Sequence, residues 1–363
     1  MHRQPVHLLA LMLGLWSSAS HAADTRTTPF RGATRLHRSV SGSLNLHVLK
    51  VDLCEPGISV RATMSSERRK TVSAFGRSVG AVAAVNADFF AWATYKPSGL
   101  AYGNGQRWAD TKNVGFESSI AFGPNRAEVL NPQQAVNPDA WVMELVSSRP
   151  MILAGGVVQH GFDAHICAGS VNAQGDCTRD PRTGIGLSQD RRTLVLAVVD
   201  GRQSGFSNGM TTAELAAAMK AEGAWDAVNM DSGGSAQMWV AGPGIVNRPS
   251  DGSERAVANH LAVVLGAEDA PAAHCPDASD AGVAASDAGV PPFDPDGGMP
   301  QEDVPDAAAE DSGDAGDSAR DAGEPVIEEP SSEGGSEQGC DCRTPDATGA
   351  ALVALTILRR RRR

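Results

Sequence analysis

The sequence lacks the features that point to several common classes of function. Residues 24–266 carry 23 Lys/Arg against 21 Asp/Glu, so no excess of positive charge suggests nucleic acid as a partner. No CxxC pair and no histidine-rich spacing predicts a zinc site. The apolar stretch at 347–358 is twelve residues long, which is shorter than the ~20 residues that a membrane-spanning helix needs.

The net charge of −12 comes mainly from one segment. Residues 267–338 contain 20 Asp/Glu and a single basic residue, Arg320, with almost no large apolar side chains. The tripeptide Asp-Ala-Gly recurs in this segment, at 280–282, 287–289, 314–316 and 321–323. Such a segment cannot bury enough apolar surface to offset the entropy lost on ordering, so we expect a disordered, self-repelling linker.

Both ends of the chain have the composition of targeting segments. Residues 1–22 combine early basic side chains, an apolar run and the pattern Ser20-His21-Ala22, which predicts a secretory signal peptide cut after Ala22. Residues 339–363 join two cysteines, the short apolar stretch and a terminal run of five arginines (359–363). This tail resembles the MYXO-CTERM class of sorting signals. The resemblance implies a C-terminal sorting or processing protease, delivery to the cell surface and a transient or lipid-type membrane attachment. An uncut membrane anchor is the alternative.

Export changes what the cysteines are expected to do. Cys167 and Cys177 lie in HICAGSVNAQGDC, a polar loop that contains glycine, and in an oxidising compartment they are predicted to form a local disulfide. Cys54 and Cys275 can also pair, but the sequence alone leaves this pairing open.

One domain of residues 23–266 remains, and its pattern predicts an α+β fold. Short apolar runs broken by Gly, Pro and Asn are typical of strands, and they lie at 44–53, 81–86, 118–123, 141–146, 151–158 and 260–265. The segment 193–230 predicts a buried strand, a helix that begins with a Thr211–Glu214 capping box, and a second buried strand. We therefore expect a mixed, strand-rich central sheet in which this βαβ unit carries the site loops.

Two aspartates follow the two strands of the βαβ unit. Asp200 comes directly after the first strand and Asp231 closely follows the second, and a loop rich in glycine follows each. Open α/β sheets bind ligands at the carboxyl ends of their strands, and glycine loops can turn backbone N–H groups towards an anion. A single aspartate beside glycine often only caps a turn, but two at the ends of neighbouring strands favour a binding site.

The run Asp231-Ser232-Gly233-Gly234 also surrounds the nucleophile of trypsin-like serine proteases. Those enzymes need a histidine base and an orienting aspartate, in the chain order His, Asp, Ser. Here the histidine candidate, His274, follows the serine and lies at the start of the predicted linker. The similarity to proteases is therefore interpreted as coincidental.

Together with its surroundings, the same turn resembles the NxDGGGS signature of the phosphodiester glycosidase family. Further segments resemble the family in order and spacing over residues 80–266, namely AVNADFF (84–90), RTGIGLS (182–188), VVDGR (198–202), GFSNGMTTAELA (205–216) and ERAVANHLAV (254–263). The chain departs from the family at Ser232, where glycine is usual. If this position requires a positive φ, serine would be strained there.

The resemblance implies hydrolysis of the bond between the anomeric carbon of a sugar and a phosphodiester oxygen. The expected substrate is a carbohydrate phosphodiester or surface glycan. Because it is an anion, the guanidinium of Arg182 is the first candidate ligand for its phosphate and Arg255 is the second. Asp231 and Asp200 are assigned the carboxylate roles, because positive charge develops on the sugar ring as the bond breaks. A phosphodiester is a fair leaving group, so a general acid is less essential than in ordinary glycosidases.

Other residues of these segments are expected to bind substrate or shape the site. Asn86 and Asn229 are predicted to bind sugar hydroxyls or to orient the loops, and Ser207 and Ser235 to donate to phosphate or cap turns. The predicted substrate-binding set also includes Gly209, Gly233, Gly234 and Glu214. The capping box gives Glu214 a structural interpretation as well.

The aromatic side chains allow two interpretations. Trp92 can stack on a sugar face, as can Trp108, Trp141 and Trp239, although burial is the commoner outcome for tryptophan. Phe89 and Phe90 are expected to lie in the core.

The expected chemistry requires no cofactor, and the sequence leaves a role for a divalent metal open. Two alternatives to the glycosidase also stay open. One is a non-catalytic glycan-binding module at the cell surface. The other is a metal-dependent phosphodiesterase in which Asp200 and Asp231 are metal ligands.

Overall fold

The computed structural model describes residues 22–134, 138 and 140–276. The chain divides into two units, 1–290 and 291–363, and all the described residues belong to the first. The predicted signal peptide (up to residue 21), the linker from residue 277 onwards and the sorting tail lie outside the described residues, and they stay predictions.

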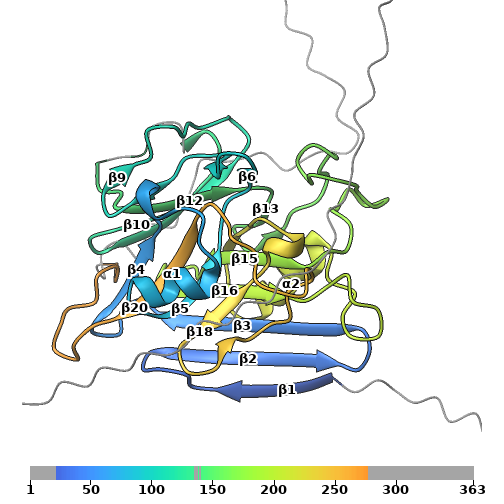
Figure 1. Cartoon of the computed structure of the whole chain (residues 1–363), viewed down its shortest axis with the longest axis horizontal. Helices are drawn as coiled ribbons and strands as arrows, with labels where there is room; N and C mark the ends of the chain where they lie inside the picture. The colour runs from blue at the N-terminus through green and yellow to red at the C-terminus, as the bar shows by residue number, and fades with distance from the viewer. Residues whose placement is uncertain (1–21, 135–137, 139, 277–363) are drawn as a thin grey trace, which may run out of the picture. The chain divides into compact units, whose positions relative to one another are not determined.

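The largest sheet has eight strands, and every neighbouring pair in it is antiparallel. In sheet order the strands are β1 (Ala22–Thr27), β2 (Ala33–Val40), β3 (Leu44–Asp52), β16 (Thr193–Val199), β15 (Arg182–Leu187), β17 (Asp226–Asn229), β13 (Met151–Ala154) and β14 (Val157–Val158). Figure 1 shows β1, β2 and β3 side by side at the bottom of the view. The middle strands β16, β15 and β17 lead into the loops of the candidate site.

Two five-stranded sheets and a two-stranded ribbon complete the strands of the described residues. One sheet contains β11 (Arg126–Leu130), β10 (Ser118–Gly123), β12 (Glu144–Ser148), β8 (Tyr102–Gly103) and β9 (Gln106–Arg107). The other contains β19 (Gly244–Ile245), β18 (Met238–Val240), β5 (Ala81–Asn86), β20 (His260–Leu265) and β4 (Ile58–Ala62). The ribbon pairs β6 (Phe90–Ala91) with β7 (Lys96–Pro97).

Two α-helices lie within the described residues, α1 (Val72–Ser78) and α2 (Thr212–Ala221), together with the 3₁₀ turns η1 (Ser65–Glu67) and η3 (Gly233–Ser235). The predicted capping box is present, because the Thr211 hydroxyl accepts from the Glu214 amide at 3.2 Å and the Glu214 carboxylate accepts from the Thr211 amide at 2.9 Å. No helix in the described part of the chain is long and apolar enough to cross a membrane.

The continuous apolar run of β16 is explained by burial on both of its faces. Leu194, Leu196 and Val198 belong to the main core, which they share with residues of β5, β18 and β20. Val195 and Val199 point to the opposite face, into the second core that contains Leu215 and Met219 of α2. Burying each such side chain contributes about 1.5–3 kcal/mol, so the strand cannot alternate apolar and polar residues as a half-buried strand does.

The predicted α+β fold is confirmed, but one detail of the βαβ unit is wrong. Strands β16 and β17 were expected to be neighbours, whereas β15 lies between them and pairs antiparallel with both. At one position Gly184 of β15 faces Ala197 on one side and Asn229 on the other. The two strands therefore still run in the same direction, but the ends that carry Asp200 and Asp231 are one strand further apart than expected.

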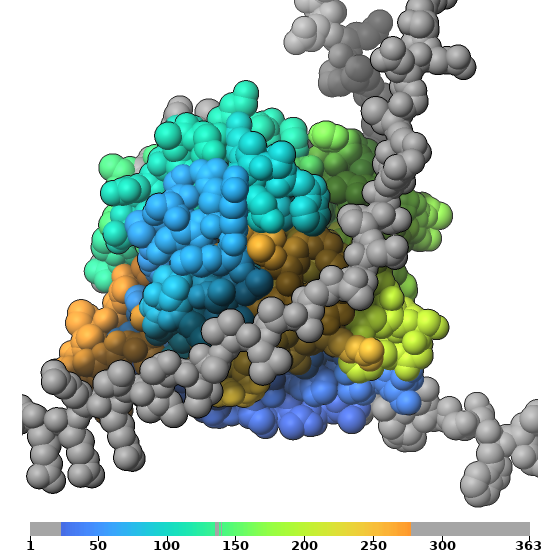
Figure 2. All heavy atoms as spheres, viewed as in Figure 1, coloured from blue at the N-terminus to red at the C-terminus, as the bar shows by residue number. Residues whose placement is uncertain are grey.

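The domain extends past residue 266, where the linker was predicted to begin. Cys54 and Cys275 form a disulfide across 221 positions of sequence, and the His274 ring accepts from the Val60 amide at 3.0 Å and donates to the Gly123 carbonyl at 2.8 Å. Closing a loop of this length stabilises the fold by about 5 kcal/mol on a chain-entropy estimate. In Figure 2, orange atoms from the end of the described chain lie beside blue atoms from its beginning.

Candidate active site

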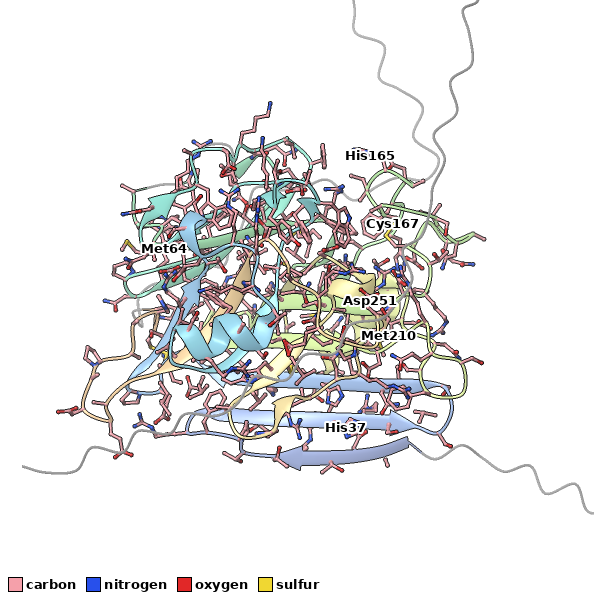
Figure 3. All side chains as sticks on the ribbon, in the orientation of Figure 1. His37, Met64, His165, Cys167, Met210 and Asp251 are labelled. Carbon is pink, nitrogen blue, oxygen red and sulfur yellow. A yellow bond between two sulfur atoms is a disulfide. The ribbon has the colours of Figure 1, made fainter. Side chains whose placement is uncertain are left out.

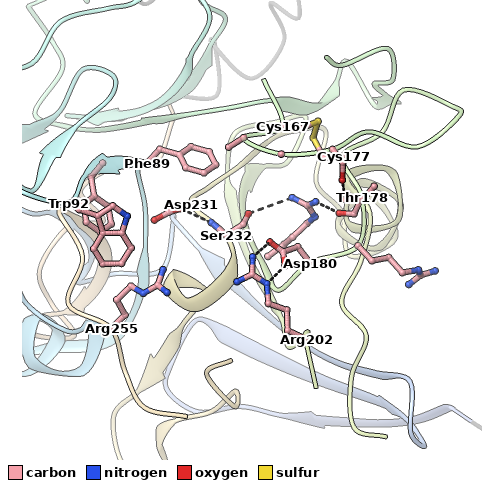
Figure 4. Close-up of a pocket in the computed structure, with 16 residues that line it drawn as sticks. Phe89, Trp92, Cys167, Cys177, Thr178, Asp180, Arg202, Asp231, Ser232 and Arg255 are labelled. Atoms are coloured by element: carbon pink, nitrogen blue, oxygen red, sulfur yellow. Dashed lines mark hydrogen bonds and ion pairs between the residues drawn. A yellow bond between two sulfur atoms is a disulfide. The ribbon is translucent and has the colours of Figure 1, made fainter. Parts of the chain in front are cut away.

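A cleft of about 430 Å³ opens where loops from distant parts of the chain meet. It is lined by aromatic residues that follow β5, by the loop that carries Cys167 and Cys177, by the start of β15, and by the turn after β17. Figure 3 labels Cys167, Met210 and Asp251. Cys167 lines the cleft, the Met210 carbonyl accepts a hydrogen bond from Arg182, and the Asp251 carboxylate accepts one from Arg255. Figure 4 shows the cleft from close range.

Asp231 lies in the cleft just after β17, and hydrogen bonds to its backbone amide and carbonyl hold it in place. Its amide donates to the Ala87 carbonyl at 2.8 Å, and its carbonyl accepts from the side chain of Asn86 at 2.8 Å. One carboxylate oxygen accepts from the Ser232 amide at 2.9 Å. Burial raises the pKa of Asp231 to about 6, while hydrogen bonds from Ser235 and Ser232 act in the opposite direction.

Arg182 begins β15, and its guanidinium is held almost entirely by neutral groups. The side chain donates to the Met210 carbonyl at 2.7 Å, to the Thr178 carbonyl, to Asn229 Oδ1 at 3.3 Å and to Ser232 Oγ at 3.5 Å. The residue is 3% exposed, and among the described residues no carboxylate lies within ion-pair distance of it. Burial lowers the pKa of Arg182 to about 10, so the group stays cationic at neutral pH. The charge of Asp180 acts in the opposite direction on this pKa, but it forms no ion pair with Arg182, so a buried cation that faces the cleft in this way is a candidate site for an anion.

The other arginines of the cleft are each paired with an acid. Arg202 donates two hydrogen bonds to Asp180, at 2.6 and 2.9 Å. The Arg255 side chain donates to Asp251 at 2.8 Å and to Ser235 Oγ at 3.2 Å. Arg179 pairs with Glu214. Arg182 is therefore the arginine of the cleft that lacks an ion-pair partner among the described residues.

The turn after Asp231 has one position whose backbone favours glycine, one where two side chains leave little space for a Cβ atom, and one that accepts serine without strain. Ser232 has a φ of −115°, so serine is unstrained there and the departure from the family pattern costs no backbone energy. Gly233 has a φ of +64°, in the region that favours glycine. A Cβ atom on Gly234 would collide with the side chains of Arg255 and Asp251.

Asp200 does not line the cleft, and the expectation that it shares a pocket with Asp231 is wrong. One carboxylate oxygen accepts from the Arg248 amide at 2.7 Å and from the Asn247 side chain at 3.1 Å. The residue is 1% exposed, and burial raises its pKa to about 6. Asp200 thus anchors the 247–248 segment, and it lies one strand further from Asp231 than expected because β15 separates β16 from β17.

Most of the predicted substrate-binding residues hold the loops in place and do not line the cleft. The Asn86 side-chain oxygen accepts from the Thr183 hydroxyl at 2.6 Å, while Asn229 accepts from Arg182. The Ser207 hydroxyl donates to the Asp200 carbonyl at 2.6 Å, and Glu214 caps α2 and pairs with Arg179. Of the two interpretations for Asn86, Asn229 and Ser207, the structure favours orienting loops and capping turns.

Three further members of the set lie close to the cleft or its supports. Ser235 is fully buried and contacts Arg255, which does line the cleft. Gly209 has a φ of +81°, packs against the backbone of Asp180 and accepts from Arg179 through its carbonyl at 2.9 Å. Gly233 lies under the guanidinium of Arg202.

A disulfide-closed loop forms one wall of the cleft. Cys167 and Cys177 are bonded, as predicted, and both line the cleft together with the residues Ala168, Gly169 and Ser170. Thr178, directly after the second cysteine, supplies a carbonyl to Arg182. The disulfide therefore orders the wall and, through Thr178, helps to place the cation.

Sequence reasoning missed several cleft residues. Phe89 and Phe90 are partly exposed and line the cleft, so their assignment to the core is wrong. Trp92, for which stacking on a sugar was one of the two interpretations from the sequence, is 62% exposed and also lines the cleft. The Asp180–Arg202 pair was not predicted, although Arg202 lies within the VVDGR segment (198–202). The available signal was position, because Phe89, Phe90 and Arg202 lie inside segments that resemble the family and Asp180 lies two residues before one.

No group of three or more His, Cys, Asp or Glu side chains gathers into a metal-binding arrangement within the described residues. The alternative in which Asp200 and Asp231 are joint metal ligands does not fit the placement of Asp200 outside the cleft.

Comparisons with known proteins are consistent with the sequence resemblance. A family model described as phosphodiester glycosidase matches residues 79–264. The prophage-derived uncharacterized protein YomE of Bacillus subtilis (strain 168) is 41% identical over 85 residues, which is 23% of this chain. The chain spans only 13% of the length of that protein.

Two solved structures are similar in architecture. The catalytic domain of zebrafish N-acetylglucosamine-1-phosphodiester alpha-N-acetylglucosaminidase, auto-inhibited by its pro-peptide, is 17% identical with a TM-score of 0.48, over 69% of this chain and 85% of that one. A hypothetical protein from Synechocystis is 14% identical with a TM-score of 0.46, over 67% of this chain and 64% of that one.

The contacts of Asp200 predict that it contributes to stability and not to the reaction. In Asp200→Ala, the Arg248 amide and the Asn247 side chain lose their acceptor, so the free energy of unfolding should fall by about 2–3 kcal/mol. Denaturant titration measures this loss, and an activity assay on the folded fraction should give a rate near that of the unchanged protein. A variant that is as stable as the unchanged protein but inactive would contradict this assignment.

Proposed function

The chain belongs to the phosphodiester glycosidase family, and we propose that it hydrolyses the bond between the anomeric carbon of a sugar and a phosphodiester oxygen. The family supports glycosidase chemistry on sugar phosphodiesters. The proposed substrate is a carbohydrate phosphodiester such as a phosphoglycan or surface glycan.

One observation carries the proposal: Asp231 and the buried Arg182 both form a hydrogen bond with Ser232. The Ser232 amide donates to Asp231 at 2.9 Å, and the Ser232 hydroxyl accepts from Arg182 at 3.5 Å. A sugar phosphodiester needs these two groups close together, since its phosphate is an anion and its anomeric carbon becomes cationic as the bond breaks.

The proposed reaction assigns one role to each group. Arg182 binds the phosphodiester and stabilises the second negative charge that appears on the phosphate when the bond to the anomeric carbon breaks and its electron pair moves to the phosphate oxygen. Asp231 stabilises the cationic ring in one of two ways. It either bonds to the anomeric carbon, in an intermediate whose new bond is then broken by water, or it takes a proton from the water that attacks the anomeric carbon directly. The products are a free sugar and a phosphomonoester.

A single unpaired carboxylate is sufficient for this scheme. The other acid that lines the cleft, Asp180, accepts two hydrogen bonds from Arg202. An ordinary glycosidase needs a protonated acid for its leaving group, whereas a phosphate oxygen leaves without one.

The position of the broken bond tests the proposed function. The protein would be incubated in ¹⁸O-water with hexose 1-(4-nitrophenyl phosphate) diesters of both anomeric forms. Attack at the anomeric carbon should give 4-nitrophenyl phosphate without ¹⁸O, whether or not EDTA is present. A phosphate product that contains ¹⁸O, and that forms only when EDTA is absent, would instead indicate a metal-dependent phosphodiesterase. Glycan binding without any turnover would indicate the non-catalytic module.

The proposed role of Asp231 predicts a pH profile. The carboxylate must be ionised, and because burial raises its pKa to about 6, turnover should rise as the pH increases through about 6 and then level off. Asp231→Asn should lower kcat at least about 100-fold. Its melting temperature should stay nearly unchanged, because asparagine still accepts from the Ser232 amide. Full turnover by this variant, or a profile flat from pH 4 to 8, would refute the role.

We also propose that the protein is exported and held at the cell surface. The two disulfides among the described residues support an oxidising compartment. Residues 1–22 are the proposed secretory signal, and residues 339–363 are the proposed sorting signal. Mass spectrometry of the protein from its native cells should find an N-terminus at Ala23 and a C-terminus near Cys340. An N-terminus at Met1 in the mature protein would contradict export by this signal.

A further inference from the structure

Trp92 is a large apolar side chain that the fold leaves open at the cleft. It is 62% exposed, whereas Trp108 and Trp239 are 1% and 6% exposed. Burying a large apolar side chain stabilises a folded protein. An indole that stays in water does not contribute this stabilisation. Since Trp92 also lines the cleft that contains Asp231, its exposure indicates a surface for ligand binding.

The position of the Trp92 ring is fixed by its neighbours. The guanidinium of Arg255 lies 4.8 Å from the ring centroid, and the Phe90 ring lies 5.4 Å away on the β6–β7 ribbon. Phe90 is in turn stacked on Tyr95 at 5.2 Å. Asp251 and Ser235 hold Arg255. A ring that is already ordered loses little entropy when a ligand packs on it.

The two ends of the cleft differ in charge. At the Trp92 end, the cation Arg255 is compensated by Asp251, so this end is aromatic and close to neutral. At the other end Arg182 has no carboxylate partner among the described residues. Figure 4 shows Asp231 between Trp92 on one side and Ser232, the hydrogen-bond partner of Arg182, on the other. A ligand with one neutral and one anionic part can therefore bind in only one orientation.

We propose that Trp92 is the platform on which the glycosyl ring of the substrate stacks, with Arg255 fixing the platform and the phosphate directed towards Arg182. This inference rests on the proposed function. The C–H face of a pyranose ring packs well on the face of an indole, and the phosphate bound by Arg182 leaves the anomeric carbon beside Asp231. Trp92 thus determines which sugars the cleft accepts, and Asp231 acts on the sugar that it holds.

Kinetics of Trp92 variants test the platform. With the hexose 1-(4-nitrophenyl phosphate) that turns over best, Trp92→Ala should raise KM about tenfold and change kcat much less. Trp92→Phe should stay within about threefold of the unchanged protein, because phenylalanine keeps an aromatic face. Both variants should melt at the unchanged temperature, since the side chain is exposed. An unchanged KM in Trp92→Ala would overturn the proposal.

Trp141 provides a matched control. It carries a similar cation, Arg126, at 4.4 Å from its ring, but it does not line the cleft. Trp141→Ala should leave KM unchanged, whatever its effect on melting temperature. A KM increase equal to that of Trp92→Ala would show that loss of any such pair loosens the protein, and would overturn the specific role of Trp92.

Inhibition by fragments of the substrate tests the orientation. In Trp92→Ala, inhibition by methyl pyranosides should weaken about tenfold while inhibition by methyl phosphate stays the same. In Arg182→Lys the pattern should reverse. Equal weakening of both inhibitors by Trp92→Ala would overturn the assigned polarity of the cleft.

Binding without turnover separates this inference from the proposed function. If no sugar phosphodiester is hydrolysed, the heat of binding to the full chain is measured by calorimetric titration with methyl α- and β-pyranosides of glucose, galactose, mannose and N-acetylglucosamine. A response that disappears in Trp92→Ala would support the platform even though the proposed hydrolysis had failed. No response from any pyranoside would overturn the platform. Hydrolysis with an unchanged KM in Trp92→Ala would overturn the platform and leave the proposed function in place.

Discussion

The site depends on the burial of one positive charge, that of Arg182. Moving a guanidinium out of water costs several kcal/mol unless hydrogen bonds replace those of the solvent. Here the replacements are the carbonyls of Thr178 and Met210 and the side chains of Asn229 and Ser232. These acceptors come from the disulfide loop, the segment before α2, strand β17 and the turn after it. Their dipoles solvate the cation without neutralising it, so the same contacts that join the segments leave a charge for an anion.

Much of the fold could be predicted from local patterns. The apolar run 193–199 and the Thr211–Glu214 capping box predict β16 and α2 correctly, because burial on two faces and helix capping act over a few residues. The insertion of β15 between β16 and β17 could not be predicted in this way. Which strand fills a gap in a sheet depends on pairings between residues distant in sequence, such as Gly184 with Asn229, and one sequence carries no record of them.

The candidate site was predictable to the same limited extent. Asp231 and Arg182 were identified from the segments that carry the family resemblance, and they do line one cleft. Asp200 was misplaced because the rule for strand ends assumes adjacent strands, and because its true partner, the Arg248 amide, lies 48 positions away. The exposure of Trp92 was equally hidden, since tryptophan in a sequence gives no sign of whether a neighbouring loop covers it. Long-range packing, and not residue type, decides these cases.

The cleft wall formed by Cys167–Cys177 has a consequence for how such a domain can diversify. The ring closed by this disulfide lies in the connection between β14 and β15, and its tip residues belong to neither of the two main cores. Thr178, just outside the ring, supplies the contact to Arg182. Substitutions or insertions inside the ring can therefore change the shape of this wall of the cleft, while Asp231, Arg182 and the sheet beneath them stay the same. A single covalently closed loop thus lets the outline of the cleft vary independently of the charged groups inside it.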